Sequence, residues 1–136
     1  MADYTIRNLR EVDDSAPKFG FAPDMQARFA GRDLGLTESG VSLQRLAPGA
    51  GQPFGHRHKR QEELYVVVDG SGRAKLGDEV VDLRRWDAVR VAPHLSRAFA
   101  AGPDGLEFLA FGAPAVESLP EDVEQEPSPW GEGAGD

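Results

Sequence analysis

The residues best suited to chemistry lie between positions 56 and 63. His56 and His58, two of the chain's three histidines, are separated by one residue, and the adjacent carboxylates Glu62 and Glu63 follow. In an extended strand, residues i and i+2 point to the same side, so both imidazoles would face one point. A strand that returns after a short reversal would bring Glu62 or Glu63 beside them. Two neutral imidazoles and one carboxylate form a ligand set suited to Fe, Zn, Mn or Ni.

The spacing of these residues resembles the first sequence motif of the cupin superfamily. That motif reads His-x-His-x4-Glu-x6-Gly, and it is matched by His56, His58, Glu63 and Gly70. The resemblance implies that the two histidines and the glutamate hold a divalent metal inside a small barrel. It also favours Glu63 over Glu62 as the inward carboxylate.

A second cupin-like motif follows about twenty residues later. Leu83, Trp86, Asp87 and Pro93 resemble the family's Leu-x-x-Gly-Asp-x5-Pro pattern, with Trp86 in place of the usual turn glycine. A third metal-binding histidine should come next in the family. The alignment places Arg97 at that position, so the implied ligand set departs from the family's pattern.

Arg97 admits three interpretations that the sequence leaves open. It could face outward without a function. It could point inward and pair with Glu63, so that a guanidinium replaces the metal. Alternatively, it could lie beside a metal and bind a substrate carboxylate or phosphate bidentately. His94 is a less favoured candidate for a displaced ligand, because Pro93 and His94 are typical of an exposed turn.

Two further residues are candidates for contact with a ligand. Tyr65 shares a strand face with Glu63 and could offer its hydroxyl, although packing is the more common role of such an aromatic residue. Gln44 lies on a strand that the implied fold would place across the barrel. Strand periodicity alone does not decide the direction in which Gln44 points.

Length, cysteine content and charge distribution exclude several classes of protein. At 136 residues the chain is long enough to bury one core, and the absence of cysteine excludes disulfides and thiolate ligands. Seven of the 23 acidic residues lie in 117–136, which leaves 16 acidic against 15 basic residues in the remainder. This charge distribution argues against nucleic acid and anionic membranes as partners. No signal-peptide pattern or membrane-length apolar run is seen, so a cytoplasmic location is expected.

Short alternating segments separated by glycine and proline predict about ten strands and no amphipathic helix. Such a pattern is typical of a β-sandwich or barrel, and the cupin resemblance, which covers residues 41–111, implies an all-β jelly-roll barrel. The predicted strands are residues 4–9, 25–30, 40–46, 53–58, 63–68, 73–76, 80–83, 88–92, 97–101 and 106–111, with turns at 69–72, 77–79 and 102–105.

The composition changes near the end of the chain. Residues 1–116 are predicted to form the barrel domain with an N-terminal extension, and residues 117–136 an acidic tail rich in proline and glycine. The tail has too few apolar residues to order itself, so irregular structure is expected. Trp130 is the one residue in it suited to packing on the barrel.

These observations support two function hypotheses. In the first, the protein binds a small, anionic molecule and is a metal-dependent enzyme on an organic acid, acting as an oxygenase, isomerase or lyase. His56, His58 and Glu63 would then hold Fe, Mn, Ni or Zn, and Arg97 would anchor the substrate. In the second, the protein is a metal-free binding module without catalysis, and Arg97 occupies the metal position. The family resemblance also implies a homodimer.

Overall fold

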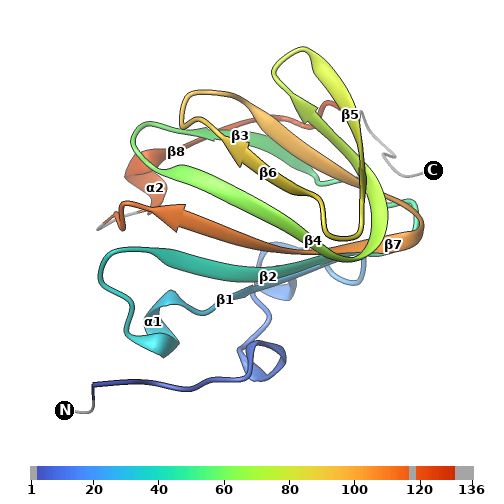
Figure 1. Ribbon diagram of the computed structural model, residues 1–136. Helices are drawn as coiled ribbons and strands as arrows, with labels where there is room; N and C mark the ends of the chain where they lie inside the picture. The colour runs from blue at the N-terminus through green and yellow to red at the C-terminus, as the bar shows by residue number, and fades with distance from the viewer. Residues whose placement is uncertain (1–2, 117–118, 131–136) are drawn as a thin grey trace.

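The structure is a computed structural model that describes residues 3–116 and 119–130. Among these residues, eight strands form one curled, antiparallel sheet (Figure 1), which confirms the predicted all-β barrel. The strands are β1 (Met25–Phe29), β2 (Gly40–Leu46), β3 (Phe54–His58), β4 (Glu62–Leu76), β5 (Glu79–Arg84), β6 (Ala88–Val91), β7 (Arg97–Ala113) and β8 (Val123–Pro127). The short helices are η1 (Leu9–Glu11), η2 (Ala16–Phe19), α1 (Gly31–Leu34) and α2 (Leu119–Asp122).

Two long strands, β4 and β7, run together through the sheet (Figure 1). The turns predicted at residues 69–72 and 102–105 are therefore wrong, because the chain continues as a strand through both segments. The pairing register shifts where β4 passes Gly70, whose φ is 74°, and Gly105 of β7 has a φ of 81°. Left-handed glycines combined with such register shifts bend and twist a strand without reversing its direction.

The crossing of Gly70 and Gly105 yields a prediction about stability. A β-carbon on Gly70 would lie 2.0 Å from the carbonyl oxygen of Gly105, on a residue that is already left-handed. We expect Gly70→Ala to lower the free energy of unfolding by about 2–4 kcal/mol, since backbone strain and overpacking add. Gly20→Ala is the control, because Gly20 has a φ of 77° but no atom within 4 Å of a β-carbon.

Urea unfolding of both variants would measure this difference. The control should lose only about 1 kcal/mol, the cost of the left-handed backbone alone. Equal losses in the two variants would show that β4 and β7 do not approach as closely as the structure indicates.

The strand that carries the two histidines, β3, lies between β7 and β8. β8 pairs with β3 along its whole length, from the partner pair Phe54 and Pro127 to the pair His58 and Val123. The irregular structure predicted for the tail is therefore wrong for residues 119–127, whereas residues 128–130 lie outside the helices and strands, as predicted. Backbone hydrogen bonds and the ion pair between Arg57 and Glu124 order this segment without a large apolar surface.

The strand predicted at residues 4–9 is also wrong. Tyr4 and Ile6 alternate as a strand would, but their exposed fractions are 75% and 77%, so they bury little apolar surface. The side chain of Asn8 instead accepts a hydrogen bond from the backbone of Arg10 and caps the turn η1. Local capping thus outweighs the alternating pattern here.

The core lies on the concave face of the sheet. Tyr65, Phe99 and Phe108 form its aromatic centre, with ring centroids 4.6–5.8 Å apart. Because successive residues of a strand alternate sides, the burial of Tyr65 and Val67 places Glu63 on the same inner face. None of the helices among the described residues is long and apolar enough to cross a membrane.

Candidate metal centre

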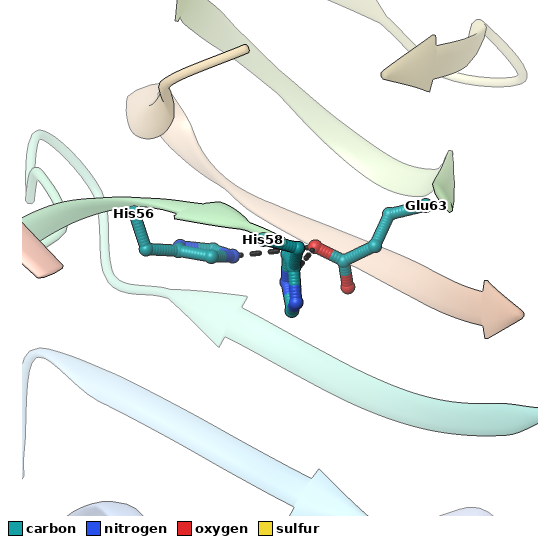
Figure 2. A group of neighbouring side chains, drawn as sticks. All are labelled: His56, His58 and Glu63. Atoms are coloured by element: carbon teal, nitrogen blue, oxygen red, sulfur yellow. Dashed lines mark hydrogen bonds and ion pairs between the residues drawn. The ribbon is translucent and has the colours of Figure 1, made fainter. Parts of the chain in front are cut away.

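β3 directs both imidazoles toward the carboxylate of Glu63, which comes from the start of β4 (Figure 2). The Nε2 atoms of His56 and His58 lie 3.2 Å and 2.9 Å from Oε1 of Glu63. One ligand atom from each of the three residues lies within 4.8 Å of the others. The structure therefore brings the three predicted metal ligands together.

Two more side chains converge on the same carboxylate oxygen. The hydroxyl of Tyr65 donates to Glu63 Oε1 at 2.6 Å, and Nη1 of Arg97 donates at 3.2 Å. Both side chains are buried, so water does not compete with them for Glu63, and both hydrogen bonds are stronger than they would be on the surface. Glu63 is thus the common acceptor of the cluster, and its negative charge is held by several neighbouring groups.

His58 lies between two carboxylates. Its Nδ1 is 2.8 Å from Oδ2 of Asp122, while its Nε2 faces Glu63. Sequence reasoning missed Asp122 because it lies in the segment predicted to be irregular. Its only sequence signal is the short alternating stretch that begins with Val123, which forms β8 beside β3.

These contacts shift the protonation of the cluster in definite directions. Burial alone would raise the pKa of the Glu63 carboxyl, but hydrogen bonds from His56, His58 and Tyr65 bring it far below its usual range. Burial opposes charge on His58, yet the hydrogen bonds to Glu63 and Asp122 raise the pKa of this imidazole overall. Burial and the nearby charge of Glu63 raise the pKa of Tyr65 well above its usual value. Glu63 therefore stays ionised while Tyr65 stays neutral.

Arg97 points into the barrel with an exposed fraction of 0%, which rules out the outward interpretation. Its Cα is the cross-strand partner of His56, so the two side chains start from the same face of the sheet. Nη1 contacts Glu63, and Nη2 donates to the carbonyl oxygens of Ala92 and Pro93 at 2.7 Å and 3.4 Å. Both ends of the guanidinium are therefore bonded to oxygens of the protein.

The structure leaves two weaker candidates outside this cluster. Gln44 lies on β2 and donates to the hydroxyl of Ser42 at 3.0 Å. Within the described residues it makes no hydrogen bond to the three candidate ligands. His94 is exposed, as expected for a turn, and is not part of the group suited to a metal.

The three donors suit a divalent metal in their number and chemical kind. Bonds of about 2.0–2.2 Å to one ion place neighbouring ligand atoms about 3 Å apart when they meet at right angles. The separations of 2.9 Å and 3.2 Å from Glu63 to the two imidazoles agree with this value. The cation of Arg97 opposes a second positive charge, but Glu63 Oε1 lies at a suitable distance from each imidazole, and the three ligand atoms lie within 4.8 Å of one another.

Comparisons with known proteins show what the chain is similar to. A family model described as a cupin domain matches residues 42–111. A cupin protein from Bacteroides fragilis is 28% identical, with a TM-score of 0.70, and the match covers 87% of this chain and 90% of that one. A sequence comparison with curated proteins gave no match.

More distant structures share the fold alone. Oxalate decarboxylase from Bacillus subtilis is 23% identical with a TM-score of 0.70, over 89% of this chain and 32% of that one. This chain therefore corresponds to about a third of that enzyme. A variant of Streptomyces PAC13, solved with uridine, is 19% identical with a TM-score of 0.70, over 96% and 99% of the two chains.

Proposed function

This chain belongs to the cupin domain family, and we propose that it binds a small molecule in the barrel at a divalent metal held by His56, His58 and Glu63. One observation carries the proposal: two imidazole nitrogens from β3 meet a carboxylate oxygen from β4 at 3.2 Å and 2.9 Å. A bound metal would supply a Lewis acid at this point and orient a ligand.

The surrounding charges favour an anionic ligand. With neutral imidazoles, Arg97 contributes one positive charge, and Glu63 and Asp122 contribute two negative charges. A divalent ion would leave one net positive charge in a site of low solvent content, where an anion is strongly attracted. A small organic acid is therefore the class of ligand we propose, as substrate of a metal-dependent enzyme.

The exposed fractions of the side chains indicate the side from which a ligand would reach the metal. Those of His56 and Glu63 are 16% and 13% exposed, whereas those of His58 and Arg97 are 3% and 0% exposed. A ligand would reach the metal from the side of His56 and Glu63. Arg97 would then act on it through its charge and through its hold on Glu63, since both of its Nη atoms bond protein oxygens.

A second candidate function rests on the position of Arg97. Its guanidinium already supplies a cation 3.2 Å from Glu63 Oε1, and a protonated His58 would balance the remaining charge of Asp122. In that arrangement the protein is a metal-free module that binds a small molecule without catalysis. Metal content separates the two functions directly.

We expect the wild-type chain to bind one equivalent of Zn²⁺, with an affinity that falls as the pH is lowered. A proton on Nε2 of His58 competes with the metal, and the raised pKa of His58 moves this loss to a higher pH than for an ordinary histidine. The lowered pKa of Glu63 keeps this ligand ionised throughout. Elemental analysis and competition with a chromophoric chelator at a series of pH values would measure both effects.

Two results would contradict the metal function. Protein purified and reloaded with Zn²⁺ that retains no metal would support the metal-free candidate. An affinity that does not fall as the pH is lowered would show that the metal binds somewhere other than His56 and His58.

A further inference from the structure

A residue of the C-terminal segment lies against the buried histidine of the centre. Val123, the first residue of β8, is the cross-strand partner of His58, which brings the preceding Asp122 beside the imidazole. We propose that Asp122 is a positioning residue that holds His58 with the lone pair of Nε2 directed toward Glu63. The inference rests on the proposed function for its effect on metal binding, but its structural part can be tested without metal.

The carboxylate of Asp122 is itself fixed in place. Its side chain is 4% exposed, and both of its oxygens have partners. Oδ1 accepts from the backbone N–H of Arg60, and Oδ2 contacts Nδ1 of His58, both at 2.8 Å. The carbonyl oxygen of Asp122 also accepts from the N–H of Lys59 at 2.8 Å. Three contacts with one short loop leave Asp122 little freedom to turn away from His58.

The chemistry of the pair decides the tautomer of the imidazole. An ionised carboxylate only accepts hydrogen bonds, so Nδ1 of His58 must carry a hydrogen to satisfy Oδ2 of Asp122. Without a metal, Nε2 can also carry a hydrogen and donate it to Oε1 of Glu63, which lies 2.9 Å away. If a metal takes the place of that hydrogen, Asp122 keeps the other one on Nδ1, and Nε2 offers its lone pair. A cation shared by Nε2 and Oε1 satisfies both. A carboxylate on the far nitrogen is the arrangement that orients histidine ligands in metal sites.

The two histidines differ in this respect. Nδ1 of His56 is buried and has no hydrogen-bond partner among the described residues. No described group holds a hydrogen on Nδ1 of His56, whereas Asp122 does so for His58. The barrel strands supply the metal ligands, and the C-terminal segment supplies the group that orients one of them.

Asp122→Asn is the informative substitution, because it keeps the shape of the side chain. The N–H of Arg60 still requires an acceptor, so the amide oxygen of the new residue faces Arg60 and its NH₂ group faces His58. That NH₂ group donates to Nδ1, which moves the hydrogen of the neutral ring to Nε2 and removes the lone pair. The matched control is Glu124→Gln, which weakens the contact of β8 with Arg57 but does not touch His58.

The experiment is a long-range ¹H–¹⁵N NMR spectrum of the full chain with labelled histidines. It is recorded without metal at an alkaline pH where His58 is neutral, and His58 is assigned by the loss of its signals in His58→Ala. Every NMR variant also carries Glu63→Gln, which leaves Asp122 as the one carboxylate among the described residues that contacts the His58 ring. We expect hydrogen on Nδ1 of His58 in Glu63→Gln and in its double variant with Glu124→Gln, and on Nε2 in its double variant with Asp122→Asn. Zn²⁺ affinity should fall about 10–100-fold in Asp122→Asn and stay within about twofold of the wild type in the control.

The spectrum of Glu63→Gln decides the inference even if the variants with Asp122→Asn fail to fold. Hydrogen on Nε2 of His58 in Glu63→Gln would overturn it, as would an unchanged tautomer in a folded double variant with Asp122→Asn. Hydrogen on Nδ1 in Glu63→Gln, together with a wild type that binds no Zn²⁺, would overturn the proposed function and leave the positioning role of Asp122 standing.

Discussion

Replacement of His58 by alanine is expected to weaken Zn²⁺ binding by at least about 100-fold. Loss of an outer partner of a metal ligand already costs about 10–100-fold, and His58 is proposed as a direct ligand. Its imidazole makes the shorter of the two histidine contacts with Glu63, and its side chain is 3% exposed. Competition with a chromophoric chelator at neutral pH would measure the loss.

The matched control is His94→Ala, which removes the exposed histidine outside the cluster. This variant should bind Zn²⁺ like the wild type. Because His58 is buried, circular dichroism should first establish that His58→Ala is folded. Glu63→Gln provides a second variant of nearly unchanged shape, which removes the negative charge of the proposed ligand. Wild-type affinity in both site variants would mean that the metal, if bound, lies elsewhere.

Replacement of Arg97 by methionine is expected to lower the free energy of unfolding of the metal-free protein by about 3 kcal/mol. The change leaves Glu63 without its buried cation and frees the carbonyl oxygens of Ala92 and Pro93. Breaking a buried ion pair on one side costs about 3–5 kcal/mol, and the remaining donors to Glu63 place this case at the lower end. Urea unfolding with a chelator present would measure the loss.

Arg57→Met is the control for this loss, because the ion pair of Arg57 with Glu124 is exposed. Its removal should cost less than about 1 kcal/mol. Similar losses in the two variants would contradict a structural role for the inward guanidinium. In Arg97→Met, added Zn²⁺ should restore part of the lost stability, since a metal on Glu63 would replace the missing positive charge.

Arg97→His separates the two candidate functions. The side chain at this position starts beside His56, so a third imidazole would be available to the metal. If the wild type already binds Zn²⁺, the variant should bind it more tightly, because a ligand is gained and a cation is lost. Metal in the variant alone would mean that Arg97 replaced a ligand in a metal-free cupin. Metal in neither protein would show that the convergence on Glu63 is not a metal centre.

Much of the fold could be predicted from local patterns. The alternation in residues 40–46 predicted β2 with the bounds that the structure has, and β1, β3, β5 and β6 differ from their predicted ranges by a residue or two. Glycine and proline marked the places where the chain bends, but the reversals predicted at residues 69–72 and 102–105 are bends within continuous strands. Gly70 and Gly105 bend two long strands that stay paired, and this depends on a partner strand far along the chain.

The N-terminal and C-terminal segments show the same limit. Alternation at Tyr4 and Ile6 predicted a strand that finds no surface to cover. The tail predicted to be irregular forms β8, because the open side of β3 offers backbone partners and Arg57 offers a charge. The alternating pattern does not say whether a surface is available to cover, and the apolar content of the tail does not say whether a neighbouring strand offers backbone partners.

The sequence by itself determined that His56 and His58 face one point, because the i, i+2 spacing of a strand requires no other part of the chain. The resemblance of its spacing to the cupin motif also favoured Glu63 as the carboxylate that could join them. Only the tertiary structure decided which groups surround these ligands. Arg97 meets Glu63, and Asp122 meets His58 across 64 residues of sequence. Such contacts follow from the pairing of β7 with β3 and β4 and of β8 with β3. Strand pairing over long distances leaves no periodic signal in the residues that it joins.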